Sequence, residues 1–256
     1  MLRSLNEITG YSLQATDGDI GCCEDFIFDD QSWVVRYMLA DTNAWLPGSK
    51  KTLISPVSLG EPDWKTTQLS ITLTKKLIKN SPERDEHKPV SREYEARFFD
   101  YYNYDYYWMG AGLWGSYPAP TTLANTIPKA SITDDEELNK VESIDDGQLR
   151  SAKEVEGYTI KSIDGEIGHV EDFILNDEDW TIAYLVVNTA SWLLLSRKVL
   201  IAPSWLASVS WIKRSVCINL TSAQIKKSPE YDTTKLIDTD NEDIVHNFYQ
   251  KLKEKI

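Results

Sequence analysis

Asp17-Gly18-Asp19-Ile20-Gly21-Cys22-Cys23-Glu24-Asp25-Phe26 is the stretch that decides the fold, because it recurs as Asp164-Gly165-Glu166-Ile167-Gly168-His169-Val170-Glu171-Asp172-Phe173. The two stretches lie 147 positions apart, and the same offset aligns Trp33 with Trp180 and Pro56 with Pro203. Roughly two positions in five are identical along the aligned copies, far more than chance gives. The chain therefore contains two copies of one small domain in tandem.

Each copy reads mainly as β-strand. The pairs Asp17-Gly18 and Asp164-Gly165 are typical of hairpin turns, in which glycine supplies the positive φ that the turn needs. Gly21 and Gly168 fall inside the following strands, where a glycine commonly marks a bulge or a close approach of another backbone segment. Several short strands at regular spacing predict a small β-barrel that closes on itself in each copy.

Helices are expected near the end of each copy. Thr74 and Thr221 each follow a strand and open a short helical pattern, so both are predicted helix N-caps. Further along, residues 91–102 begin with a capping pattern and carry an apolar stripe, and residues 238–249 repeat that stripe. We therefore expect a C-terminal helix after each barrel.

These patterns divide the chain into three regions. Residues 1–100 are predicted to form the first barrel with its helix, and residues 151–256 the second barrel with its helix. Residues 101–150 begin with an aromatic-rich segment and continue as an acidic linker that contains proline and threonine, for which flexibility is expected.

Composition argues against several classes of function. The 256-residue chain has 27 Lys and Arg against 40 Asp and Glu, a formal net charge of -13, which opposes direct binding to nucleic acid or anionic lipid. No apolar run is long enough to span a membrane. Cys22, Cys23 and Cys217 form no disulfide framework and are interpreted as reduced thiols, so a cytoplasmic location is expected.

Further motifs accompany the repeated stretch. Each copy carries Asp-Gly-x-Ile-Gly and Glu-Asp-Phe-Ile, then a strand that begins at Trp33 or Trp180, and then Leu-Ile-x-Pro at residues 53–56 or 200–203. This pattern resembles the PRC-barrel domain family, which includes the cytoplasmic domain of the photosynthetic reaction-centre H subunit and the C-terminal domain of the ribosome maturation factor RimM. The resemblance implies a small six-stranded β-barrel in each copy and a role in protein contacts without catalysis.

The aromatic segment, residues 101–117, is the strongest candidate for a binding site. Tyr and Trp provide large contact areas at low entropic cost and dominate the hot spots of protein interfaces. The candidate partner-binding residues are Tyr104, Tyr106, Tyr107, Trp108 and Trp114. The alternative is that the segment folds back over a barrel or fills the groove between the two, since a free aromatic segment invites aggregation.

Other candidate sites have simpler structural explanations. The pairs Glu24-Asp25 and Glu171-Asp172 could form an acid/base couple or a cation site, but adjacent strand residues face opposite ways, which favours pairing with turn amides or basic neighbours. Cys22 and His169 occupy equivalent positions and are metal-binding residue types, yet two ligands do not complete a tetrahedral site. No catalytic or phosphate-binding motif is present, so no cofactor, metal or enzymatic activity is expected.

Two functional hypotheses remain. The leading one is a non-enzymatic protein-interaction or scaffold module, whose two barrels pair within the chain or in a homodimer and present a surface to a protein partner. The other is a small-ligand or metal-responsive binding protein with its site between the two barrels, because pockets occur frequently at such boundaries.

Overall fold

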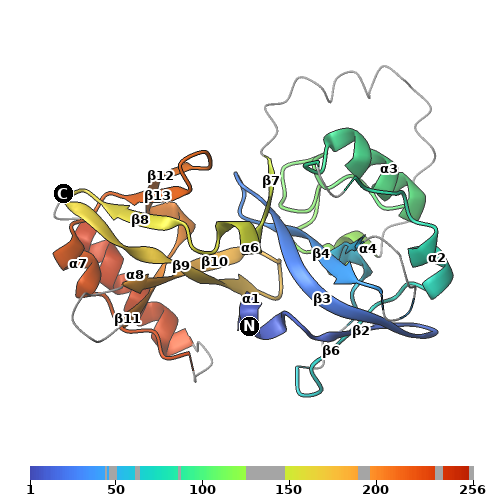
Figure 1. Cartoon of the computed structure of the whole chain (residues 1–256), viewed down its shortest axis with the longest axis horizontal. Helices are drawn as coiled ribbons and strands as arrows, with labels where there is room; N and C mark the ends of the chain where they lie inside the picture. The colour runs from blue at the N-terminus through green and yellow to red at the C-terminus, as the bar shows by residue number, and fades with distance from the viewer. Residues whose placement is uncertain are drawn as a thin grey trace. The chain divides into compact units, whose positions relative to one another are not determined.

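The computed structural model of this chain describes residues 1–43, 45, 51–60, 64–85, 88–124, 148–189, 197–233 and 239–253, with side chains of the last helix described from 243 to 251 (Figure 1). The protein is mainly β and contains two sheets. It divides into two compact units: Thr9–Arg150, called here the first-copy unit, and Met1–Ile8 with Ser151–Ile256, called the second-copy unit. We expected residues 1–8 to belong with the first copy, and strand pairing explains the difference.

The first-copy unit is built on one sheet with the strand order β5-β4-β3-β2-β6, to which β7 is added beside β3. Neighbours from β2 to β5 are antiparallel, whereas β6 runs parallel to β2. The strands are β2 (Ser12–Ala15), β3 (Gly18–Asp29), β4 (Val35–Asp41), β5 (Thr52–Ile54), β6 (Gln68–Ser70) and β7 (Leu149–Ser151). Most side chains of β4 and of the second half of β3 are buried, so these strands form the centre of the core.

The second-copy unit repeats this arrangement. Its sheet has the order β11-β10-β9-β8-β13-β12, with β1 added beside β9, and β13 runs parallel to β8 as β6 does to β2. The strands are β1 (Leu2–Ser4), β8 (Thr159–Ser162), β9 (Gly165–Asn176), β10 (Ile182–Thr189), β11 (Arg197–Ile201), β12 (Leu206–Ser210) and β13 (Ser215–Ile218).

Neither sheet closes on itself. Among the described residues, no strand pairing joins β5 to β6 in the first-copy unit or β11 to β12 in the second-copy unit. The prediction of closed barrels is therefore wrong for this structure. β5 and β11 end just before Pro56 and Pro203, and each proline begins a 3-10 turn because it has no N–H with which to extend a ladder.

Each unit contains a strand that comes from the other copy of the repeat. At the offset of 147, Leu2-Arg3-Ser4 in β1 corresponds to Leu149-Arg150-Ser151 in β7. β1 pairs antiparallel with β9 of the second copy, whereas β7 pairs with β3 of the first copy. The two copies thus exchange their N-terminal strands reciprocally, which places residues 1–8 in the second-copy unit.

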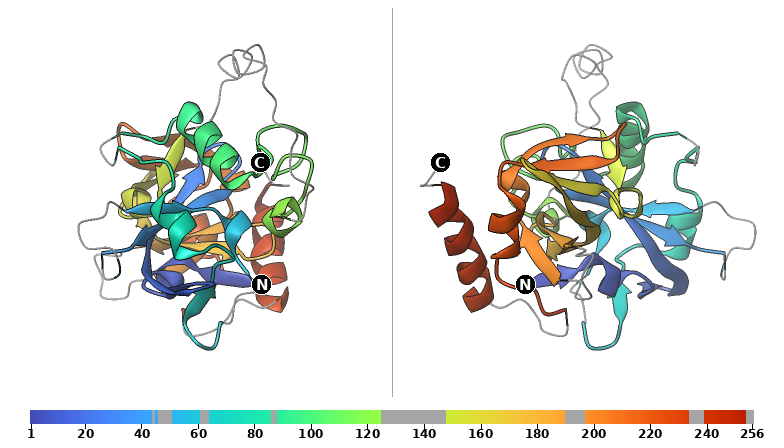
Figure 2. Two further views of the ribbon diagram at one scale, coloured as in Figure 1. Left: turned by 90° about the vertical axis from the view of Figure 1, so that its right-hand side faces the viewer. Right: turned by 60° about the vertical axis from the view of Figure 1, so that its left-hand side comes forward.

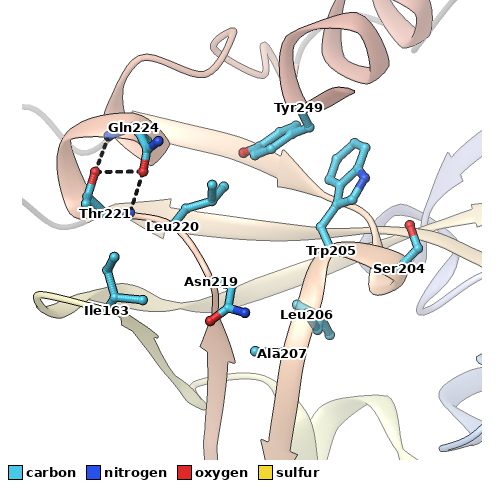
Figure 3. A pocket seen from close by; sticks show the side chains of 10 residues that line it. All are labelled: Ile163, Ser204, Trp205, Leu206, Ala207, Asn219, Leu220, Thr221, Gln224 and Tyr249. Carbon is cyan, nitrogen blue, oxygen red and sulfur yellow. Dashed lines mark hydrogen bonds between the residues drawn. The ribbon is translucent and has the colours of Figure 1, made fainter. Parts of the chain in front are cut away.

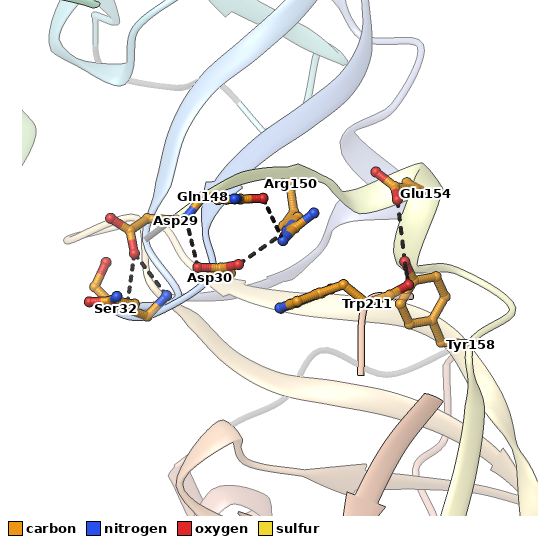
Figure 4. A network of polar contacts seen from close by, with 9 residues as sticks. Asp29, Asp30, Ser32, Gln148, Arg150, Glu154, Tyr158 and Trp211 are labelled. Atoms are coloured by element: carbon orange, nitrogen blue, oxygen red, sulfur yellow. Dashed lines mark hydrogen bonds and ion pairs between the residues drawn. The ribbon is translucent and has the colours of Figure 1, made fainter. Parts of the chain in front are cut away.

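Two equivalent aspartates hold the exchanged strands. Asp30 accepts a hydrogen bond from Nε of Arg150 in β7 at 3.1 Å (Figure 4). Its counterpart Asp177 accepts a hydrogen bond from the N-terminal amine of Met1 and lies 4.0 Å from Nε of Arg3 in β1. Both exchanged strands are therefore tied to their sheets by the same type of charge pairing.

The helices are short except for one after each sheet. Thr74 and Thr221 are the N-caps of α2 (Lys75–Lys79) and α7 (Ser222–Lys226), as the sequence predicts. The others are α1 (Leu5–Ile8), α3 (Arg92–Tyr102), α4 (Pro120–Ala124), α6 (Ala152–Val155), α8 (Thr239–Lys253) and the 3-10 turns η1 (Pro56–Ser58) and η2 (Pro203–Trp205). α3 and α8 begin 147 positions apart, and Figure 2 shows α8 beside the sheet of the second-copy unit.

The repeated glycines lie where the backbone leaves no room for a side chain. Gly21 and Gly168 have φ values of +116° and +151°, and a Cβ at either position would lie 1.9 Å from the carbonyl oxygen of Asp41 or Asn188. The ladder register also shifts next to each glycine. Both hairpins can therefore approach the neighbouring strand this closely only with glycine.

The aspartates of the two hairpin turns accept hydrogen bonds from helix amides. Oδ1 of Asp17 accepts a hydrogen bond from the backbone N–H of Lys75 at 2.8 Å, at the start of α2. Oδ1 of Asp164 accepts one from the backbone N–H of Ser222 at 2.7 Å, at the start of α7. This hydrogen bond and those from the Ser222 and Ser162 hydroxyls lower the pKa of Asp164 to about 2.

Candidate functional site

The aromatic segment folds against α3 of its own unit. Tyr107 and Trp114 are buried, whereas Tyr104, Tyr106 and Trp108 are part-exposed. The ring of Phe99 in α3 lies 6.1, 5.6 and 5.5 Å from the rings of Tyr104, Tyr107 and Trp108, measured between centroids. Of the two arrangements that the sequence left open, the segment has the packed one within the first-copy unit.

A buried carboxylate fixes the segment to the sheet. Glu95 of α3 is 2% exposed, and its Oε1 accepts hydrogen bonds from the hydroxyls of Tyr37 at 2.9 Å and Tyr107 at 2.7 Å. Its Oε2 lies 2.9 Å from Nη1 of Arg92. One carboxylate therefore joins β4, α3 and the aromatic segment.

Burial dominates the acid–base properties of this cluster. It raises the pKa of Glu95, and the guanidinium of Arg92 and the two tyrosine hydroxyls oppose that rise. The pKa values of Tyr37 and Tyr107 lie well above the ordinary tyrosine value, because burial and the nearby Glu95 both disfavour a phenolate. The tyrosines thus remain hydrogen-bond donors to Glu95.

The buried cation Arg36 supports the same segment. The guanidinium carbon of Arg36 lies 3.8 Å from the ring centroid of Tyr107 and 5.0 Å from that of Trp114. Its Nη1 donates a hydrogen bond of 2.5 Å to the carbonyl oxygen of Leu113, and burial lowers its pKa. Arg36 therefore stabilises the buried part of the segment through contacts with the two rings and a hydrogen bond to the backbone.

The remaining aromatic side chains form a patch on the surface, defined here as Tyr106, Trp108 and Met109. The rings of Tyr106 and Trp108 are stacked, with centroids 4.6 Å apart and planes 11° from parallel. The Tyr106 hydroxyl donates to Asp100 at 2.8 Å, and the guanidinium of Arg92 lies 4.3 Å from the Trp108 ring centroid. Met109 is 45% exposed. The aromatic patch is thus held in place by contacts with Asp100 and Arg92 of α3.

A cavity of about 720 Å³ lies in the second-copy unit, between α8, η2 and the β12–β13 hairpin (Figure 3). Trp205 and Tyr249 form one side, with ring centroids 4.1 Å apart and planes 25° from parallel. Burial raises the pKa of Tyr249 to about 12. The lining residues are Ile163, Ser204, Trp205, Leu206, Ala207, Asn219, Leu220, Thr221, Gln224 and Tyr249. None of them carries a charge.

The acidic pairs have structural partners. Glu24 forms an ion pair with Lys51 at 2.5 Å, and the equivalent Glu171 forms one with Lys198 at 2.5 Å. The adjacent Asp172 accepts a hydrogen bond from the hydroxyl of Ser4 at 2.5 Å. Pairing with basic neighbours is therefore observed for both glutamates, and Asp172 helps to bind the exchanged N-terminal segment.

Cys22 and His169 are not part of a metal-binding cluster within the described residues. Cys22 lies in β3 and His169 at the equivalent position of β9. In the part of the chain that the structure describes, no three His, Cys, Asp or Glu side chains gather closely enough to hold an ion. The cysteines at 22, 23 and 217 form no disulfide bond.

Comparison with known proteins adds no identity. The sequence matches no protein-family model and no curated protein.

No helix in the described part of the chain is long and apolar enough to cross a membrane.

Sequence reasoning missed the two features that shape these sites. Glu95 lies on α3 between Tyr94 and Ala96. Its burial was not predicted, because a charged residue is usually exposed. One feature of the sequence could have indicated the cavity: Trp205 occupies the position that corresponds to Ser58 in the first copy. Such a small-to-large difference between aligned repeats indicates that the two copies are covered differently at this point.

Proposed function

We propose that this protein is a non-enzymatic interaction module of two PRC-type β units, and that the aromatic patch binds a protein partner. The observation that carries the proposal is the part-exposed stack of Tyr106 and Trp108, next to the exposed side chain of Met109. Aromatic residues and methionine are enriched at protein interfaces, where a few of them supply most of the binding free energy.

Preorganisation supports this function. The aromatic patch alternates along the chain with Tyr107 and Trp114, which Glu95 and Arg36 hold in the interior. A surface that is already ordered loses less conformational entropy when it binds, so more of its contact free energy appears as affinity. The buried residues of the predicted binding set thus act as supports, and the part-exposed ones make the contact.

Charge and cysteine state support the remaining parts of the proposal. A net charge of -13 disfavours nucleic acid and anionic surfaces as direct partners. The three cysteines form no disulfide bond, which fits a reducing compartment, and we propose the cytoplasm.

The test is affinity capture from cells that produce the protein naturally, with Met109→Glu as the variant. A new charge at the centre of an apolar contact is expected to lower partner recovery at least about tenfold. Ile212→Glu is the matched control, because Ile212 is 96% exposed and lies in the other unit. Equal recovery with wild-type protein and Met109→Glu would refute the role of the aromatic patch.

A further inference from the structure

A carboxylate with one unused oxygen borders the aromatic patch. Asp100 of α3 is exposed, and its Oδ1 accepts the hydrogen bond of 2.8 Å from the Tyr106 hydroxyl. This bond fixes the carboxylate at the edge of the patch. Its Oδ2 has no hydrogen-bond partner among the residues that the structure describes. One oxygen of Asp100 is therefore fixed by the patch, and the other can accept a hydrogen bond from a partner.

Two further carboxylates lie on the same border. Asp105 directly precedes Tyr106, is part-exposed, and has no side-chain partner in the described part of the chain. Glu93 is exposed on α3, seven residues before Asp100. Residues seven apart lie on one side of an α-helix, because seven residues make nearly two full turns. The border of the patch and the adjoining side of α3 thus carry three carboxylates.

The nearby cations leave this negative charge largely uncompensated. The guanidinium of Arg92 lies 2.9 Å from the buried carboxylate of Glu95, so its charge is already paired. Arg97 is exposed, and its guanidinium carbon lies over the ring of Tyr94, 6.0 Å from the centroid. Residues 98–128 contain no Lys or Arg, although these make up 27 of the 256 residues in the chain. The electrostatic potential around the aromatic patch is therefore negative.

Apolar surface lies next to these carboxylates. Met109 is 45% exposed and follows the part-exposed ring of Trp108. Lys and Arg side chains combine an apolar stem with a charged head, so the stem can cover an apolar surface while the head reaches a carboxylate beside it. The patch and its border have the two features that such a side chain requires.

We propose that the aromatic patch binds a basic segment of a partner protein, with Lys or Arg stems against Met109 and their charged heads paired with Asp100 and Asp105. The inference rests on the proposed function and deepens it by naming the chemistry of the partner. The net charge of -13 also attracts a basic segment from a distance and speeds its association with the chain.

The first experiment selects peptides without assuming their charge. A phage-displayed library of random dodecapeptides is depleted on the Met109→Glu variant and then selected on the wild-type full-length chain. Met109→Glu is more acidic than the wild type, so depletion removes peptides that bind through net charge alone. Lys and Arg are expected to be enriched at least about twofold over the unselected library, because electrostatic complementarity decides which segments fit.

The second experiment locates the contact. The most enriched peptide, labelled with fluorescein, is titrated with the chain and followed by fluorescence anisotropy. The double variant Asp100→Asn/Asp105→Asn removes two charges, preserves side-chain size and retains an acceptor for Tyr106, and should weaken binding about fivefold. Asp105→Asn alone should weaken it about twofold, which keeps the test decisive if the double variant does not fold. Glu166→Gln/Glu178→Gln is the matched control, because it removes two exposed carboxylates from the second-copy unit.

Each result has one meaning. Selected peptides that depend on Met109 but are acidic or uncharged overturn this inference and leave the proposed function standing. Equal weakening by the patch variants and by the control pair would assign the attraction to net charge and overturn it too. If no peptide distinguishes wild-type protein from Met109→Glu, the inference is overturned, and affinity capture with the same variant decides the proposed function separately.

Discussion

The two copies hold their C-terminal helices by different interactions. α3 is fixed by the buried carboxylate of Glu95, which accepts a hydrogen bond from Tyr37 of β4. In contrast, α8 packs through Tyr249, whose ring stacks on Trp205 of η2. The hairpins beneath have remained alike down to the paired glycines Gly21 and Gly168. Backbone constraints have therefore kept the sheet the same in both copies, while the layer that covers it has changed.

The largest expected effect is that of substituting Glu95, which should destabilise the first-copy unit and leave the other unit unchanged. Glu95→Ala leaves the buried hydroxyls of Tyr37 and Tyr107 and the part-exposed guanidinium of Arg92 without their common acceptor, which should cost about 4 kcal/mol. Hydrogen exchange measured by mass spectrometry should show faster exchange in β3 and β4 and unchanged exchange in β9 and β10. Glu93→Ala, on the exposed face of α3, is the control. Equal loss of protection in both units would contradict the assignment.

Substitution of either paired glycine is expected to destabilise its own unit by the same amount. Gly21→Ala and Gly168→Ala each introduce a Cβ that would lie 1.9 Å from a carbonyl oxygen, at a positive φ. Each should destabilise its own unit by about 3 kcal/mol, from backbone strain and forced displacement of the neighbouring strand. Urea unfolding together with hydrogen exchange can measure both effects. A mild effect at one glycine only would show that the two hairpins are not equivalent.

The exchanged strands are expected to respond to loss of their aspartate partners. Asp30→Ala removes the acceptor for Arg150 and should weaken the attachment of β7 by about 2 kcal/mol. Asp177→Ala should act in the same way on β1 through Met1 and Arg3. Faster amide exchange confined to Leu2–Ser4 or Leu149–Ser151 is the measurement. Protection that survives either substitution would assign the attachment to the backbone ladder alone.

The smallest expected effect is a pH dependence at Asp164. Its folded pKa of about 2 lies below the unfolded value, so its contribution to stability is complete above about pH 4 and is lost as the pH falls toward 2. The difference in unfolding free energy between wild-type protein and Asp164→Asn should therefore disappear on acidification. A constant difference across this range would show that the hydrogen bonds to Ser222 do not depend on the charge.

The sequence predicted the features that depend on local backbone chemistry. The N-caps Thr74 and Thr221 follow from residue type and position, and the repeat aligned Gly21 with Gly168, which have the same backbone role. The mainly β character follows from the short alternating strands. Each of these features is decided within a few residues along the chain.

The features that sequence reasoning missed depend on contacts between distant segments. Leu-Arg-Ser occurs before both copies, so the sequence contains no signal for which sheet each strand joins. Closure of a barrel depends on the register at edges near Pro56 and Pro203, which a count of strands does not fix. The buried position of Glu95 required knowledge that two tyrosines and an arginine would meet it.

The reciprocal pairing of β1 with β9 and of β7 with β3 limits how the chain can be divided. A cut within residues 101–147 yields a piece that keeps β1 but lacks the partner strand β9, and another that keeps β7 but lacks β3. Each piece lacks the strand that pairs with β3 or β9 in the intact chain, so the backbone N–H and C=O groups along that strand are unpaired and favour aggregation. Mixed together, the pieces have the means to reassemble by fragment complementation, and a single repeat expressed alone would have to find a second copy of itself to complete its sheet.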